Sequence, residues 1–103
     1  MSQIHKHDKY VDELCEKVKV HYDLCYTNLP MFSEKKRLIG EIDLIGVCGE
    51  YIDVYEVKCS HRPTKAKKQL KKIRKILSKI NEFKHIRTFF YCGESSRLEM
   101  IAS

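Results

Sequence analysis

The chain has 103 residues, of which 33% are charged and 43% hydrophobic, a composition that suits one folded domain and excludes a disordered chain. The net charge of +6 favours an anionic partner, with nucleic acid ahead of an anionic membrane surface. No apolar run reaches the roughly 18 residues that span a bilayer, and residues 1–7 lack the apolar core of a signal peptide. We therefore expect a cytoplasmic protein with no membrane partner.

The cysteines and histidines give no recognisable metal or disulfide motif. The five cysteines are scattered, odd in number and without a C-x-x-C pair, so we expect free thiols, mostly buried as small hydrophobes, and no disulfide partner. His5, His7 and Asp8 have the side chains of a transition-metal site, but their place near a terminus favours a solvated, mobile segment.

The first third of the chain predicts a helix and then an ambiguous stretch. Asp8 can cap a helix over residues 8–20, where apolar residues recur at helical spacing on one face. Glu13 lies just beside that face, and Glu16 points nearly opposite. Within residues 21–36 we expect a turn or loop at 28–30 and one short strand around 24–26.

Two long strands are predicted next, over residues 37–47 and 51–59. Alternation places Ile42 and Leu44 on one face of the first strand and Asp43 on the other. Both strands carry apolar groups on both faces, which predicts a sheet covered on both sides, as in a layered α/β domain.

A hairpin that turns at residues 49–50 sets residues whose numbers sum to 99 opposite each other. Asp43 then faces Glu56, and Glu41 faces Lys58. Like charges directly across a strand pair are destabilising, so the Asp43–Glu56 pair needs a reason. A hard divalent cation such as Mg²⁺ supplies one, because it binds through one or two carboxylates with water and substrate phosphate.

The second half predicts a long helix and two more strands. After a loop at residues 60–63, apolar residues at helical spacing predict a helix over 63–81 with Ala66, Leu70, Ile73, Leu77 and Ile80 as its buried stripe. Strands follow over 87–92 and 97–102. The helix carries eight basic residues and no acid: Lys65, Lys67, Lys68, Lys71, Lys72, Arg74, Lys75 and Lys79. An anionic partner would relieve the repulsion among them, although such a face is often only solvated surface.

These motifs in this order resemble the PD-(D/E)XK, or restriction-endonuclease-like, nuclease superfamily. The segments GEIDLI at 40–45 and EVK at 56–58 look like the signature of a family of small bacterial nuclease-like proteins. The segment YVDE at 10–13 is similar to the first-helix motif of archaeal Holliday junction resolvases. The proline of the superfamily's name is absent, because Ile42 precedes Asp43.

The resemblance implies a role for each matching residue. Asp43 and Glu56 would bind Mg²⁺, for which Mn²⁺ can substitute, with help from the backbone carbonyl of Val57. Lys58 would orient the attacking water and stabilise charge on the phosphate, and Glu13 would reach the metal from the first helix. Gln69 would be a phosphate or water contact, while a surface glutamine is an equally good interpretation.

The sequence therefore predicts an α/β domain over 1–103 with a restriction-endonuclease-like core, a mixed sheet flanked by helices in the order α-β-β-α-β-β. We expect a homodimeric, Mg²⁺-dependent DNA endonuclease that reads DNA shape, such as junctions, flaps or nicks. Alternatives are a non-catalytic DNA-binding module of the same fold and a nuclease acting on RNA or single-stranded ends. A simpler interpretation of the hairpin is a Glu41–Lys58 ion pair without a metal.

Overall fold

The computed structural model describes residues 3–79 and 85–101, with side chains from Lys6 onward. Within these residues, two long helices and five strands form an α/β fold. In chain order the elements are α1 (Gln3–Val18), a short 3-10 helix η1 (Lys19–His21), β1 (Leu24–Phe32), β2 (Leu38–Cys48), β3 (Tyr51–Lys58), α2 (Pro63–Leu77), β4 (His85–Cys92) and β5 (Arg97–Ile101).

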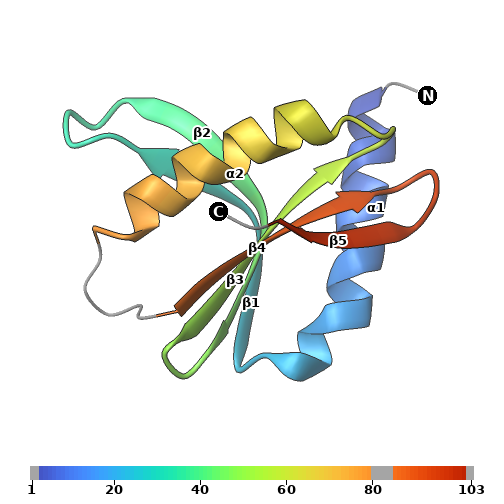
Figure 1. The fold of residues 1–103 in the computed structure, drawn as a ribbon, viewed down its shortest axis with the longest axis horizontal. Helices are drawn as coiled ribbons and strands as arrows, with labels where there is room; N and C mark the ends of the chain where they lie inside the picture. The colour runs from blue at the N-terminus through green and yellow to red at the C-terminus, as the bar shows by residue number, and fades with distance from the viewer. Residues whose placement is uncertain (1–2, 80–84, 102–103) are drawn as a thin grey trace.

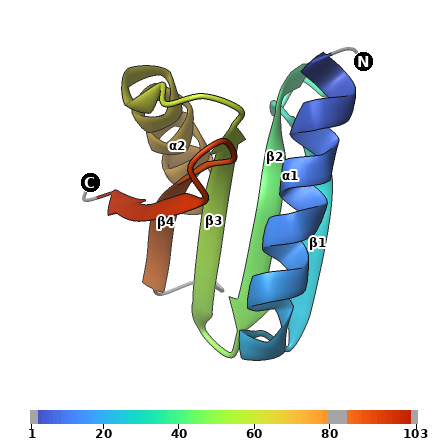
Figure 2. The same ribbon diagram turned by 90° about the vertical axis from the view of Figure 1, so that its right-hand side faces the viewer.

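The strands form one mixed sheet in the order β1-β2-β3-β4-β5. Of the described strand pairs, only β3 and β4 are parallel, because α2 connects them as a crossover (Figure 1). Figure 2 shows α1 and α2 on opposite sides of the sheet. The predicted α/β class and the predicted coverage of both faces are therefore confirmed.

Each helix covers its own apolar cluster. On the α2 side, Leu70, Ile73 and Leu77 pack with sheet residues that include Ile52 and Val54. The predicted stripe of α2 is confirmed for these residues and for the buried Ala66; Ile80 lies outside the described residues. On the α1 side, Val11, Leu14 and Val18 pack with Leu44, Tyr55, Val57 and Tyr91.

Two glycines of the sheet and its turns let α1, and the residue that follows η1, lie close to the sheet. A Cβ on Gly93 would lie 2.2 Å from the ring of Tyr10, and one on Gly46 would lie 2.4 Å from the ring of Tyr22. Real Cβ atoms do not approach so closely, so both positions need the bare backbone. The contact at Gly93 fixes the N-terminal half of α1 beside the end of β3, because the Gly93 N–H donates to the Lys58 carbonyl at 2.8 Å.

The boundaries before β2 differ from those predicted. The first helix begins at Gln3, so Asp8 lies within it and is no cap. Residues 24–32 form one nine-residue strand rather than a short strand and a loop at 28–30. Pro30 is compatible with this because β1 is an edge strand, where a missing N–H costs little.

The hairpin register is as predicted, but the alternation of β2 is not. Each pair from Cys48–Tyr51 to Leu44–Tyr55 has numbers that sum to 99. Ile42, however, joins the cluster under α2, whereas Leu44 joins the one under α1. The faces therefore shift by one at Asp43. The neighbouring β1 is irregular at the same level, because Asn28, at φ 54°, lies between the residues paired with Ile42 and Leu44, while the pairing register is the same on both sides of it.

Candidate functional site

The site is centred on two buried carboxyl groups where the pairing of β2 with β3 ends. Asp43 is 7% and Glu56 is 4% exposed, and their side chains are hydrogen-bonded to each other. Pairing stops at Leu44–Tyr55, and beyond it the Val57 N–H donates instead to Asp43 Oδ2 at 2.9 Å. Figure 2 shows the two strands diverging at this end. The predicted meeting of Asp43 and Glu56 is thus observed, through side chains rather than backbone pairing.

The two carboxyl groups ionise differently. Burial, followed by the hydrogen bond to Asp43, raises the pKa of Glu56 from its usual 4.5 to about 9. Burial also disfavours ionised Asp43, but hydrogen bonds from His7, Glu56 and the Val57 N–H outweigh it and hold the pKa of Asp43 below its usual value. At neutral pH Glu56 is therefore protonated and donates to an ionised Asp43. The pair holds one proton that a cation can replace.

Glu56 has a further property of a metal ligand. Its Oε2 atom is buried, and no group among the described residues forms a hydrogen bond with it. An unsatisfied buried oxygen is costly. A cation bound to this atom would remove the cost, so the two carboxylates present fit the divalent cation that the resemblance implies.

The raised pKa of Glu56 should make the protein less stable as the pH rises. Between about pH 4.5 and pH 9 the folded protein keeps a proton that the unfolded chain releases, so the free energy of unfolding falls with pH by up to about 1.4 kcal/mol per unit. Glu56→Gln removes this term. Urea unfolding should show the variant gaining, relative to wild type, up to about 4 kcal/mol between pH 5 and pH 8, because the slope applies over nearly three pH units. The exposed control Glu13→Gln should gain almost nothing, and an equal gain in both would contradict the assignment.

His7, in the first turns of α1, reaches the carboxyl pair, although its place near the terminus predicts a solvated segment. Its Nε2 donates to the Val57 carbonyl at 2.9 Å and lies 3.4 Å from Asp43 Oδ2. The hydrogen bond to Asp43 raises the pKa of His7, against the opposing effect of burial. This expectation is wrong because α1 begins at Gln3 rather than at Asp8. His7 therefore lies within the helix, where its ring contacts Val57 near the end of β3.

Glu13 is not at the site. It is exposed, since α1 docks through Val11, Leu14 and Val18, and Glu13 lies roughly 130° around the helix from the middle of that stripe. The predicted contact with Asp43 or Glu56 is therefore wrong. Glu16 is exposed as predicted and pairs with Lys19 at 2.8 Å.

A cleft of about 520 Å³ lies beside the carboxyl pair, and Lys58, Glu41 and His7 line it. Lys58 is half-buried, and no ion pair joins it to Glu41 within the residues that the structure describes. The simpler interpretation, a Glu41–Lys58 bridge, thus has no support. Three further cationic side chains line the cleft, one from α1 and two at the start of α2: Lys6, Arg62 and Lys65. Arg62, just before α2, was not predicted.

Gln69 packs against the backbone of β2. Its Nε2 would lie 3.2 Å from a Cβ placed on Gly40, three residues before Asp43. The predicted position of Gln69 near the site is thus consistent with the structure, and the glycine of the GEIDLI segment has a packing reason. A role for Gln69 in contacting phosphate or water stays a prediction.

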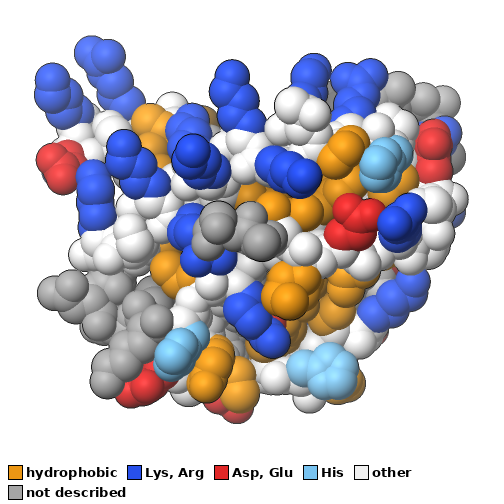
Figure 3. Space-filling model, viewed as in Figure 1, with side chains coloured by type: hydrophobic (Ala, Val, Ile, Leu, Met, Phe, Trp, Pro, Cys, Tyr) orange, Lys and Arg blue, Asp and Glu red, His pale blue; other side chains and the backbone are white. Residues whose placement is uncertain are grey.

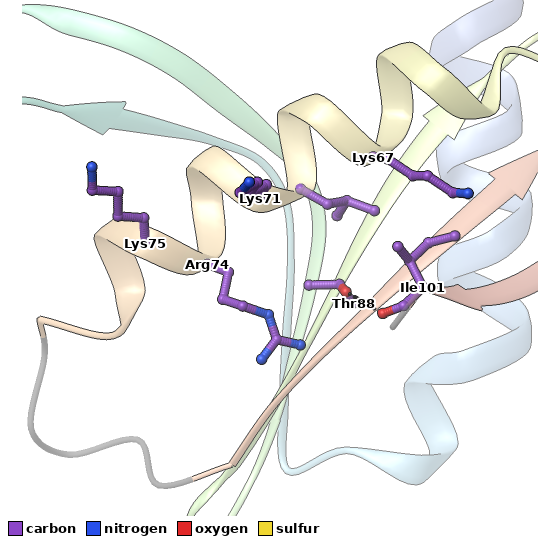
Figure 4. A pocket seen from close by; sticks show the side chains of 7 residues that line it. Lys67, Lys71, Arg74, Lys75, Thr88 and Ile101 are labelled. Atoms are coloured by element: carbon purple, nitrogen blue, oxygen red, sulfur yellow. Dashed lines mark hydrogen bonds between the residues drawn. The ribbon is translucent and has the colours of Figure 1, made fainter. Parts of the chain in front are cut away.

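The basic residues of α2 divide between different surroundings, although Figure 3 shows them gathered over one side of the molecule. Of the described lysines of this helix, only Lys65 lines the cleft with Lys58. Lys72 donates to the Ile39 carbonyl at 2.5 Å, and Lys68 is exposed. The others line a second pocket of about 380 Å³ between α2 and the β4–β5 strands, where Leu70, Thr88 and Ile101 form the floor (Figure 4): Lys67, Lys71, Arg74 and Lys75.

A third buried carboxyl group, Asp53, lies on the α1 side of the sheet. Asp53 is 1% exposed and accepts two hydrogen bonds of 2.7 Å from Arg87 and one of 2.5 Å from the Tyr22 hydroxyl. All of its partners lie away from the cleft beside Lys58. No local pattern in the sequence marks this cluster, because its members are 31 and 34 residues apart.

The cysteine side chains are less buried than predicted. Cys92 is buried, but Cys48 is exposed, and Cys15, Cys25 and Cys59 are half-buried. The Sγ atoms of Cys15 and Cys25 lie 3.9 Å apart.

Three further findings concern metal-binding groups, membrane-spanning helices and related proteins. Among the described residues, no three His, Cys, Asp or Glu side chains gather as a metal-binding group. None of the described helices combines the length and apolar character needed to cross a bilayer. A scan against protein-family models finds no match, and neither does a search of the curated proteins.

Proposed function

We propose that this protein is a Mg²⁺-dependent endonuclease of restriction-endonuclease-like fold that hydrolyses DNA phosphodiesters. One observation carries the proposal: buried, hydrogen-bonded Asp43 and Glu56, one with an unsatisfied oxygen, lie beside a cleft lined by Lys58. A stability role alone does not account for two carboxyl groups placed against each other in a nearly dry environment.

The fold supports this proposal. A helix precedes the β2–β3 hairpin, Asp43 and Glu56 lie on adjacent strands, and α2 leads to a parallel β4, as the resemblance implies. Lys58 follows Glu56 by two residues and lines the same cleft.

Different residues of the chain would bind the cation, orient the attacking water and bind the phosphates. Asp43, Glu56 and the Val57 carbonyl would hold the cation, which when bound lowers the pKa of water and neutralises charge on the phosphate. Lys58 orients the attacking water and offsets charge on the phosphate oxygens. Lys65 and Arg62 hold the neighbouring phosphates at the cleft, which gives affinity without reading base sequence.

The substrate is structured DNA, because the described chain has no long loop that could read bases. Among the connections that the structure describes in full, the longest is the short segment of residues 33–37 between β1 and β2. Labelled linear, nicked, flapped and four-way-junction DNA should be cut in Mg²⁺ or Mn²⁺ and left intact in EDTA. Binding without cleavage in any metal would instead support the non-catalytic module, and cleavage of RNA alone would reassign the substrate. A homodimer that cuts both strands stays a prediction.

The basic face of α2 should set the salt dependence of DNA binding. Changing Lys67, Lys68, Lys71 and Lys75 together to Gln should weaken binding, and each lost phosphate contact should reduce the slope of log affinity against log salt by about 0.9. Fluorescence anisotropy over a salt series measures the slope. A control with the same loss of charge elsewhere replaces Lys9, Lys19, Lys35 and Lys36 and should leave the slope nearly unchanged. Equal slopes in the two variants would place the DNA elsewhere.

A further inference from the structure

The imidazole of His7 lies among the oxygens that the proposed cation would use. Nε2 is 2.9 Å from the Val57 carbonyl oxygen and 3.4 Å from Asp43 Oδ2, and the ring lines the same cleft as Lys58. Three potential metal donors from α1, β2 and β3 therefore meet at one point. The resemblance implies two of these donors, Asp43 and the Val57 carbonyl, but not His7.

The spacing of these atoms is that of neighbouring ligands on one metal ion. Six-coordinate cations with bonds of about 2.1 Å hold adjacent ligand atoms about 3 Å apart. The two distances from His7 Nε2 are close to this value.

We propose that His7 is a direct ligand of the divalent cation, together with Asp43 and the Val57 carbonyl, and that it shifts the preference of the site from Mg²⁺ toward Mn²⁺. This inference rests on the proposed function, because it concerns the same cation. Imidazole suits transition metals, whereas Mg²⁺ prefers oxygen ligands only.

Metal binding then exchanges one contact of His7 for another. In the metal-free protein Nε2 carries the proton that it donates to the Val57 carbonyl. As a ligand, Nε2 must be without that proton, so the neutral ring then carries its single proton on Nδ1. His7 thus occupies the position that was predicted for Glu13, with nitrogen in place of oxygen.

Calorimetric titration with Mn²⁺ and Mg²⁺ tests the proposal without any substrate. Removing even an outer partner of a metal site costs about 10–100-fold in affinity, so His7→Ala should weaken Mn²⁺ binding at least tenfold and Mg²⁺ binding less. His7→Glu should restore binding with Mg²⁺ favoured over its ratio in wild type. His21→Ala, which removes an exposed histidine of η1, is the matched control.

Pulsed electron paramagnetic resonance of bound Mn²⁺ gives a second readout. Wild type and His21→Ala should show the coupling of a directly bound imidazole nitrogen, and His7→Ala should lack it. Unchanged or tighter Mn²⁺ binding by His7→Ala, or no nitrogen coupling in wild type, would overturn the role of His7 and leave the nuclease proposal standing. Failure of wild type to bind either metal would overturn both.

Discussion

Asp43→Asn and Glu56→Gln should each reduce DNA cleavage by at least about 10³-fold while leaving the fold and DNA binding in place. Each change keeps the size of the side chain and removes one carboxylate from the proposed cation. The amide oxygen in the first variant can still accept the Val57 N–H bond, and the amide nitrogen in the second can still donate to Asp43, so the local packing has no reason to collapse. Single-turnover cleavage of a labelled junction or flap, at saturating protein and Mg²⁺, measures the loss.

Two controls separate chemistry from folding and binding. Circular dichroism and anisotropy should show that both variants fold and bind DNA in EDTA as wild type does. Glu13→Gln should cut normally, because Glu13 is an exposed residue of α1 away from the carboxyl pair. Full cleavage by either carboxylate variant would remove the assignment of a metal site to Asp43 and Glu56.

Asp53→Ala should cause the largest loss of stability of any single charge removal discussed, about 2 kcal/mol in the free energy of unfolding. Asp53 is 1% exposed and holds both Arg87 and Tyr22 in place. Without it, the Tyr22 hydroxyl loses its charged partner beside the core, whereas the guanidinium of Arg87, whose side chain is 54% exposed, is left to water. Urea unfolding at neutral pH measures the difference from wild type.

An exposed ion pair of the same chemistry provides the comparison. Arg97 contacts Glu99 at 2.9 Å on β5, with the Arg97 side chain 67% exposed. Glu99→Ala should cost less than about 1 kcal/mol, as surface pairs do. If Asp53→Ala cost no more than Glu99→Ala, the Asp53 cluster would be solvated in solution rather than closed.

The sequence predicted the elements that local patterns determine. The two-residue turn at Gly49, whose φ is 59°, follows from a glycine between two strand-like runs, and that turn fixes the register of the hairpin. The apolar stripe of α2 was equally clear, because its residues recur at helical spacing along the whole helix. These features depend on residues close together in the chain.

The errors concern features that depend on contacts between distant segments. The shift of faces at Asp43 lies opposite the left-handed Asn28 of a different strand. Helical spacing and the resemblance of the YVDE segment both predict Glu13 near the carboxylates, but the docking of Tyr10 on Gly93 decides which turn of α1 reaches them. The nearness of His7 to a terminus predicts a solvated side chain, because its contact with Val57, 50 residues away along the chain, leaves no local signal in the sequence.

Anomalous diffraction from crystals soaked in Mn²⁺ tests the central claim most directly, because it locates the cation without reference to activity. The account predicts a strong peak at coordination distance from Asp43, Glu56 and the Val57 carbonyl, and the loss of that peak in crystals of Asp43→Asn. A peak elsewhere on the molecule, or none at a Mn²⁺ concentration that supports cleavage, would contradict the account.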